Sequence, residues 1–198
     1  MSLQVKKESG SIYDPVFLKI IEEIPGGVTV KTNRFPTATT EIKKGALLNA
    51  DATTAGLYNV LKTVRLTAAY ASNVTAMAVE APHLFKVGEY IHIYGVTAGT
   101  ITRVASTGIV CAAIAHTATA SGTVLDEATA AATTDYAILY AANAFLRDTI
   151  EVRKDGVATL LDNIFAGAVV RGTVDESELP YFVSTADKTS LTDRIRLA

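Results

Sequence analysis

Apolar positions near the N-terminus repeat with the spacing of a helix. Asp14 is a residue type that caps helices, and Pro15 suits a first helical position. Pro25 and the two glycines that follow it favour the end of the element. The pattern therefore predicts a short amphipathic helix over residues 14–24, with an apolar face made of Phe17, Ile20, Ile21 and Ile24.

From Val28 onward the apolar period changes to two, which is typical of strands. Short β-branched runs recur between Gly, Pro, Asn, Asp and Ser, among them TVKTN, YIHIYGV, TITRVAS, GIVCAAI and TIEVRK. They predict a mainly β protein, with one or more β-sandwich or β-barrel-like domains. Ser184 stands three residues before Asp187 and predicts a short C-terminal helix through Leu191, and the tail DRIRLA offers an edge strand.

An internal similarity relates residues 44–61 to residues 121–139. Both segments have a turn glycine, a short apolar strand, an Ala/Thr/Asp loop and a strand that opens near a tyrosine. Corresponding hairpins or coincidence in an Ala/Thr-rich chain explain this equally well. We expect an N-terminal arm and helix (1–27), a β-rich main domain (28–174) and a C-terminal segment (175–198). If the two segments are corresponding hairpins, the main domain consists of two similar subdomains, at about 28–80 and 81–174.

Composition narrows the classes of function. A formal net charge of −2 and the lack of any Lys/Arg cluster argue against nucleic-acid binding. The N-terminus has no apolar signal region and no apolar run approaches membrane-spanning length, so we expect no membrane partner and synthesis in the cytoplasm. The lone Cys111 excludes an intrachain disulfide. Large apolar side chains are scarce, which favours association with other chains.

The sequence offers no convergent chemistry. The three histidines, His83, His92 and His116, lie far apart without metal-ligand spacing, and His92 fits a satisfied strand histidine. Phosphate-binding glycine motifs and a nucleophile elbow are missing. Adjacent acidic residues, such as Asp126 and Glu127, are expected to be solvated. We therefore expect no enzyme activity, no metal and no cofactor.

Several short motifs resemble the head decoration and auxiliary capsid proteins, or head fibres, of tailed bacteriophages. Residues 41–48 with Gly56 to Tyr58 resemble the "G-[TA]-x-L … G-x-Y" opening of head decoration proteins. Residues 85–91, 99–104 and 120–125 resemble the "F-x-V-G-D-x-I … I-T-x-I … G-x-x-L" series of β-rich phage head proteins, with Glu89 at the usual Asp position. These pieces span much of the chain from Glu41 onward.

The resemblance implies a virion structural protein bound to the outside of a capsid, where it strengthens the shell. It implies the major capsid protein as partner and self-association as a trimer or another symmetric oligomer. A head fibre or tail-associated protein that binds host surfaces or glycans is the alternative. Residues of the predicted N-terminal helix are the candidate subunit contacts, although the helix could equally pack on its own sheet: Phe17, Ile20, Ile21 and Ile24.

Overall fold

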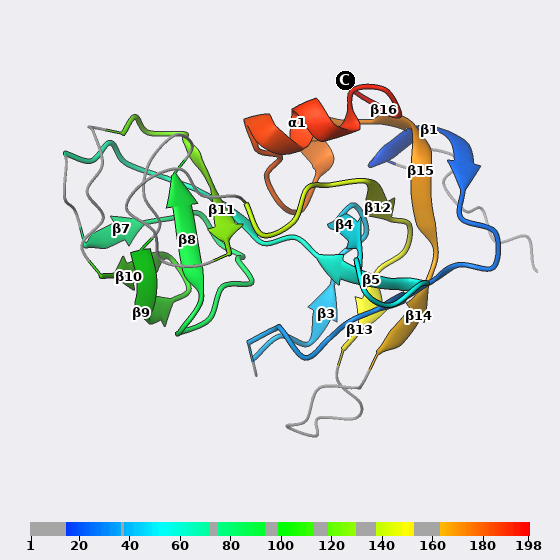
Figure 1. The fold of residues 1–198 in the computed structure, drawn as a ribbon. Helices are drawn as coiled ribbons and strands as arrows, with labels where there is room; N and C mark the ends of the chain where they lie inside the picture. Colours follow the sequence, from blue (N-terminus) through cyan, green and yellow to red (C-terminus); the bar gives the residue numbers. More distant parts are fainter. Residues whose placement is uncertain are drawn as a thin grey trace, which may run out of the picture.

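The computed structural model describes residues 15–36, 38–71, 75–93, 99–112, 119–129, 138–152 and 163–198 (Figure 1). The predicted N-terminal arm and His116 lie outside these residues. The elements are β1 (Phe17–Glu23), β2 (Val28–Val30), β3 (Glu41–Ile42), β4 (Leu47–Ala50), β5 (Leu57–Val60), β6 (Thr63–Arg65), β7 (Ala76–Ala78), β8 (Tyr90–Ile93), β9 (Gly99–Ala105), β10 (Gly108–Cys111), β11 (Val124–Ala128), β12 (Ala144–Leu146), β13 (Ile150–Glu151), β14 (Ile164–Ala166), β15 (Ala168–Val174), the 3-10 helix η1 (Glu176–Glu178), α1 (Thr185–Leu191) and β16 (Ile195–Leu197). The prediction of a mainly β fold is confirmed.

The larger sheet curls into a first barrel. Its strand order runs β15-β12-β4-β5-β2-β14, and β14 and β15 are one extended run interrupted only at Gly167. The pairings therefore return to the run from which they start, which leaves few free strand edges. Side chains from all of these strands fill the interior, including Val30, Leu48, Val60, Leu146, Ala166 and Ala168.

A second barrel is inserted into the first, between β5 and β12. Its six strands run in the order β6-β11-β8-β9-β10-β7, and a bridge between Leu66 and Val79 joins β7 back to the end of β6. Apolar side chains from these strands form a separate core: Val64, Leu66, Met77, Val79, Phe85, Ile91, Ile101, Ile109, Cys111 and Leu125. The strands at 63–128 thus lie between the strands at 17–60 and those at 144–197, which differs from the expected subdomains at 28–80 and 81–174.

The two similar segments do not form two equal units. Each has a turn glycine with positive φ, Gly45 at 85° and Gly122 at 84°, before a buried strand. In the first segment β4 and β5 form an antiparallel hairpin inside the first barrel. In the second, β11 belongs to the second barrel and meets Ile138 only through a bridge at Ala128, where the chain returns to the first barrel.

The predicted N-terminal helix is wrong, because these residues form β1 along β15. From Phe17 to Ile20, β1 advances by three residues while β15 advances by only two, because Phe17 faces Val174 and Ile20 faces Gly172. A bulge of this kind gives a strand apolar residues three apart, which imitates a helical period. Isoleucine at positions 20, 21 and 24 also favours a strand.

The C-terminal segment covers the outside of the first barrel. Ser184 accepts a hydrogen bond from the backbone N–H of Asp187 and caps α1, so the predicted helix through Leu191 is confirmed. The tail forms β16, which pairs in parallel with β15. A third apolar cluster joins these elements to β12 and β15, with Phe17, Phe145, Val169, Leu191 and Ile195 among its members.

Candidate functional site

Exposed apolar side chains are concentrated in β1. Five large apolar residues are exposed in the described part of the chain, and three of them belong to β1: Leu18 (43% exposed), Ile20 (39%) and Ile21 (58%). β1 is the end strand of its sheet, and β15 is its only partner among the described strands. Such an edge with apolar side chains is typical of a contact surface.

The structure separates the four predicted contact residues. Ile20 and Ile21 are exposed as that role requires, whereas Phe17 is buried in the cluster under α1. Ile24 is half-buried against the core of the first barrel. Leu18 was missed because a helical reading places it off the apolar face. The candidate surface is therefore Leu18, Ile20 and Ile21, which we call the β1 surface.

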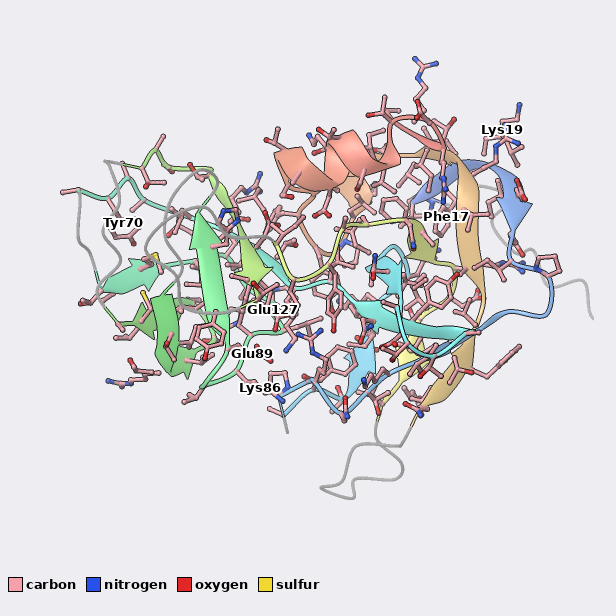
Figure 2. The ribbon with its side chains drawn as sticks, viewed as in Figure 1. Phe17, Lys19, Tyr70, Lys86, Glu89 and Glu127 are labelled. Carbon is pink, nitrogen blue, oxygen red and sulfur yellow. The ribbon has the colours of Figure 1, made fainter. Side chains whose placement is uncertain are left out.

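Charged residues lie among the apolar residues of the β1 surface. Lys19 is exposed, and no ion pair joins it to another described side chain. Glu22 approaches Arg171 at 3.6 Å, and Glu23 pairs with Arg147 at 2.9 Å. Figure 2 shows Phe17 and Lys19 on the side of the molecule away from Glu89, Glu127 and Tyr70.

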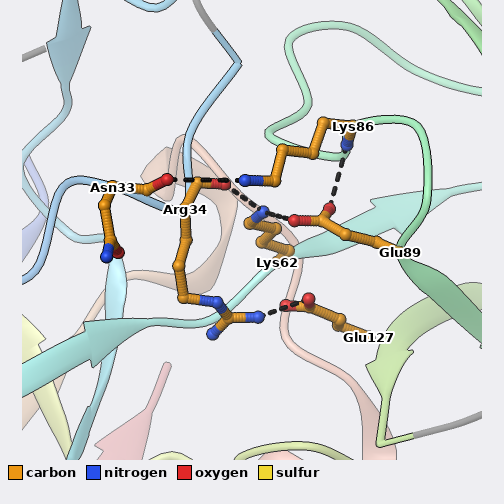
Figure 3. A network of polar contacts seen from close by, with 6 residues as sticks. All are labelled: Asn33, Arg34, Lys62, Lys86, Glu89 and Glu127. Carbon is orange, nitrogen blue, oxygen red and sulfur yellow. Dashed lines mark hydrogen bonds and ion pairs between the residues drawn. The ribbon is translucent and has the colours of Figure 1, made fainter.

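A buried polar network joins the two barrels (Figure 3). Lys62 lies where the chain crosses from β5 to β6, and its Nζ donates to the backbone oxygen of Arg34 at 2.5 Å and to Glu89. The Arg34 guanidinium donates to Glu127 and stacks over the Tyr140 ring at 4.7 Å. Arg34 belongs to the first barrel, and both glutamates belong to the second.

Two cations, Lys62 and Arg34, are ion-paired with the two carboxylates of this network, while a third, Lys86, donates from Nζ to the backbone oxygen of Asn33 at 3.4 Å. The Lys62 side chain is fully buried, and burial lowers its pKa although Glu127 and Glu89 oppose that shift. Burial likewise raises the pKa of Glu127, against the effect of Lys62 and Arg34. A buried ionic network contributes modest net stability, but removal of one partner is strongly destabilising because it leaves an unpaired charge in the interior.

A groove of about 990 Å³ lies between the second barrel and the C-terminal segment. Asp126 of β11 lines it, beside Ser184 at the start of α1. Burial, and then the charge of Asp187, raise the pKa of Asp126 to about 8. The Asp187 carboxylate accepts hydrogen bonds from Ser184 Oγ and from the backbone N–H of Ala142. The groove thus has a protonated acid beside it at neutral pH.

The expectation that Asp126 and Glu127 are solvated is wrong, because both are 5% exposed. Both acids belong to β11, which pairs with β6 on one side and with β8 on the other, so this strand is enclosed between two others. Leu125 faces the core of the second barrel, and the acids reach the junction instead. The sequence held one hint that these acids have a partner. Lys62 stands between the apolar residues Leu61 and Val64, where a charged side chain is unusual unless it is paired.

The two described histidines, His83 and His92, make separate contacts in the second barrel. His92 is buried on β8, and burial lowers its pKa to about 4. The His83 ring lies 2.8 Å from the backbone oxygen of Ala105. Within the described residues, no group of three or more His, Cys, Asp or Glu side chains is placed to hold a metal ion. Cys111 is buried, and burial raises its pKa to about 11.

Together, the fold and these surfaces define a two-barrel β protein with a buried ionic junction and an end strand that exposes apolar side chains. No protein-family model, curated protein or solved structure matches the chain. Among the described residues, no helix has the length and apolar character needed to cross a membrane.

Proposed function

We propose that this chain is a virion structural protein, an auxiliary or decoration protein that binds the outside of a bacteriophage capsid and stabilises the shell. The observation that supports it is the β1 surface, since this one strand holds three of the five large apolar residues that are exposed in the described part of the chain. A protein that acts by covering surface needs such an area rather than a reactive centre. Its partners are the major capsid protein and further copies of itself.

The junction supports the same role. Two chain crossings and the network around Lys62 join the barrels, so a contact made by one barrel sets the position of the other. A protein that binds a symmetric shell gains from this rigidity, because less conformational freedom is lost on binding. The proposed location is the capsid surface, after synthesis in the host cytoplasm.

A head fibre or tail-associated protein that binds glycans is the second candidate, and the groove beside Asp126 favours it. Its lining is mixed, with Arg65 and Lys188 beside Leu179 and Phe182. The Arg65 guanidinium, however, lies over the Phe182 ring at 4.1 Å and covers the aromatic face on which a sugar ring could stack. A glycan array with the full-length protein distinguishes the two functions.

Cosedimentation of the purified protein with undecorated capsids tests the proposal. Saturable binding at a fixed ratio of copies to capsid subunits, together with a higher temperature of capsid disruption, is the expected result. Capsids already carrying their full set of auxiliary protein are the matched control and should bind none. Failure to bind undecorated capsids, with glycan binding on the array, would replace the proposal by the second candidate.

A further inference from the structure

We infer that a small cavity between the two barrels binds one water molecule, held by Glu127, Lys62 and Tyr140. The cavity has a volume of about 10 Å³. It is lined by residues of β11 and of both chain crossings: Leu61, Lys62, Thr63, Asp126, Glu127 and Tyr140. All of these except Tyr140 are at most 5% exposed, so the lining is largely buried. The site is a property of the junction and is independent of the proposed function.

Backbone hydrogen bonds bring the three holding residues together. The N–H of Glu127 donates to the backbone oxygen of Lys62 at 3.2 Å, and the N–H of Leu139 donates to the backbone oxygen of Glu127 at 2.8 Å. Lys62 lies on the crossing from the first barrel to the second, whereas Leu139 and Tyr140 lie on the return to β12. The two crossings therefore meet at Glu127, and both of them line the one cavity.

The Glu127 carboxylate is the group that requires a ligand. Its side chain is only 5% exposed, and the Arg34 guanidinium donates to Oε1 (Figure 3). Oε2 is buried and has no hydrogen-bond partner among the described residues. A buried carboxylate oxygen that has lost its hydration without gaining a donor is costly. Buried polar groups that lack a protein partner commonly bind an ordered water, which here would donate to Oε2.

Lys62 and Tyr140 offer the further bonds that hold such a water in place. The described contacts of Lys62 Nζ use two of its three protons, on the backbone oxygen of Arg34 and on Glu89. Burial raises the pKa of Tyr140, and the charges of Arg34 and Glu127 act on it in opposite directions, so its hydroxyl lies near both. A water that donates to Glu127, accepts from Lys62 and bonds the Tyr140 hydroxyl makes three hydrogen bonds, which is usual for a buried water.

Size and charge select water over an ion. One water needs roughly 10–15 Å³ measured in this way, which the cavity just supplies, and a polyatomic or organic ligand needs more. A cation in the cavity would lie beside the Lys62 ammonium, and an anion would lie beside the Glu127 carboxylate. Water avoids both conflicts because it donates to the carboxylate and accepts from the ammonium.

Crystals of the full-length protein, grown with and without rubidium bromide, test the site. We expect density for one water within hydrogen-bond distance of Glu127 Oε2 and Lys62 Nζ, and no anomalous signal from rubidium or bromide at that position. An anomalous peak there would overturn the inference in favour of an ion. An empty cavity, with Arg34 rotated so that Nη1 donates to Glu127 Oε2, would overturn it in favour of a bidentate ion pair, because Arg34 Nη1 is also buried without a partner.

Oxygen-17 magnetic relaxation dispersion tests the same site in solution. Tyr140→Phe removes one of the three bonds, and we expect it to shorten the residence time of one long-lived water by roughly 5-fold. Tyr58→Phe, at a half-buried tyrosine of β5 that does not line the cavity, is the matched control and should change nothing. Unchanged dispersion in Tyr140→Phe, or an equal change in both variants, would overturn the assignment. Circular dichroism of each variant verifies its fold.

Discussion

Replacing Asp126 by Asn should stabilise the protein relative to the wild type, and this difference in the free energy of unfolding should increase as the pH rises. Asp126 is 5% exposed and faces Ser184 and Asp187 across the groove. Burial and the Asp187 charge favour its protonated form, so a neutral amide of the same shape removes a group that resists ionisation. Ser184 can keep its hydrogen bond to Asp187 in the variant.

The sign follows from proton linkage. The pKa of Asp126 is about 8 in the folded protein against 3.8 in a model peptide. Between these values the folded state keeps a proton that the unfolded state releases, so the wild-type protein loses stability as the pH rises through this window. At about 1.4 kcal/mol per pKa unit, the shift from 3.8 to about 8 corresponds to a loss on the order of 6 kcal/mol.

Urea denaturation of both proteins at a series of pH values measures this effect. The difference in free energy of unfolding should grow by about 1.4 kcal/mol per pH unit between about pH 4 and pH 8 and then level off. Other titrating groups, such as His92 and Glu127, cancel in that difference unless Asp126 alters them. Asp148→Asn, at an exposed carboxylate, is the matched control. A difference that stays constant over the window would refute the reasoning about Asp126.

Three further variants test the junction, the strand and the helix cap by urea denaturation. Lys62→Met leaves Glu89 without its ion partner and removes a cation close to Glu127, so it should cost about 3–5 kcal/mol. A loss below about 1 kcal/mol would mean that bulk water reaches the network. Gly172→Ala places a Cβ 2.4 Å from the Lys19 carbonyl oxygen, so it should lower the free energy of unfolding by about 1–3 kcal/mol. The amides of β1 should also exchange faster with solvent, and unchanged exchange would contradict the close packing of β1 on β15. Ser184→Ala removes the cap of α1 and should cost about 1 kcal/mol, whereas Thr189→Ala, at an exposed site within α1, serves as its control.

Alternation along the chain predicted strands well but could not predict how the sheets close. The parallel pairing of β2 with β5 and the bridge between Leu66 and Val79 join residues that carry no local signal for each other. The insertion of the second barrel into the sequence of the first also involves the bridge between Ala128 and Ile138, after which the chain continues to β12. Those contacts depend on tertiary packing, which cannot be predicted from the apolar–polar alternation or from turn residues alone.

The β1 surface was predicted in part, through the wrong element. Ile20 and Ile21 belong to a strand because β15 packs closely against β1, and Gly172 permits this approach at the Lys19 carbonyl oxygen. Gly172 lies far along the chain, so the local pattern of residues 14–24 could not reveal it. A Cβ there would meet backbone atoms, so the identity of one distant residue helps to decide the conformation of β1. C-terminal helix α1 was easier, since its cap and its first turn are adjacent in sequence.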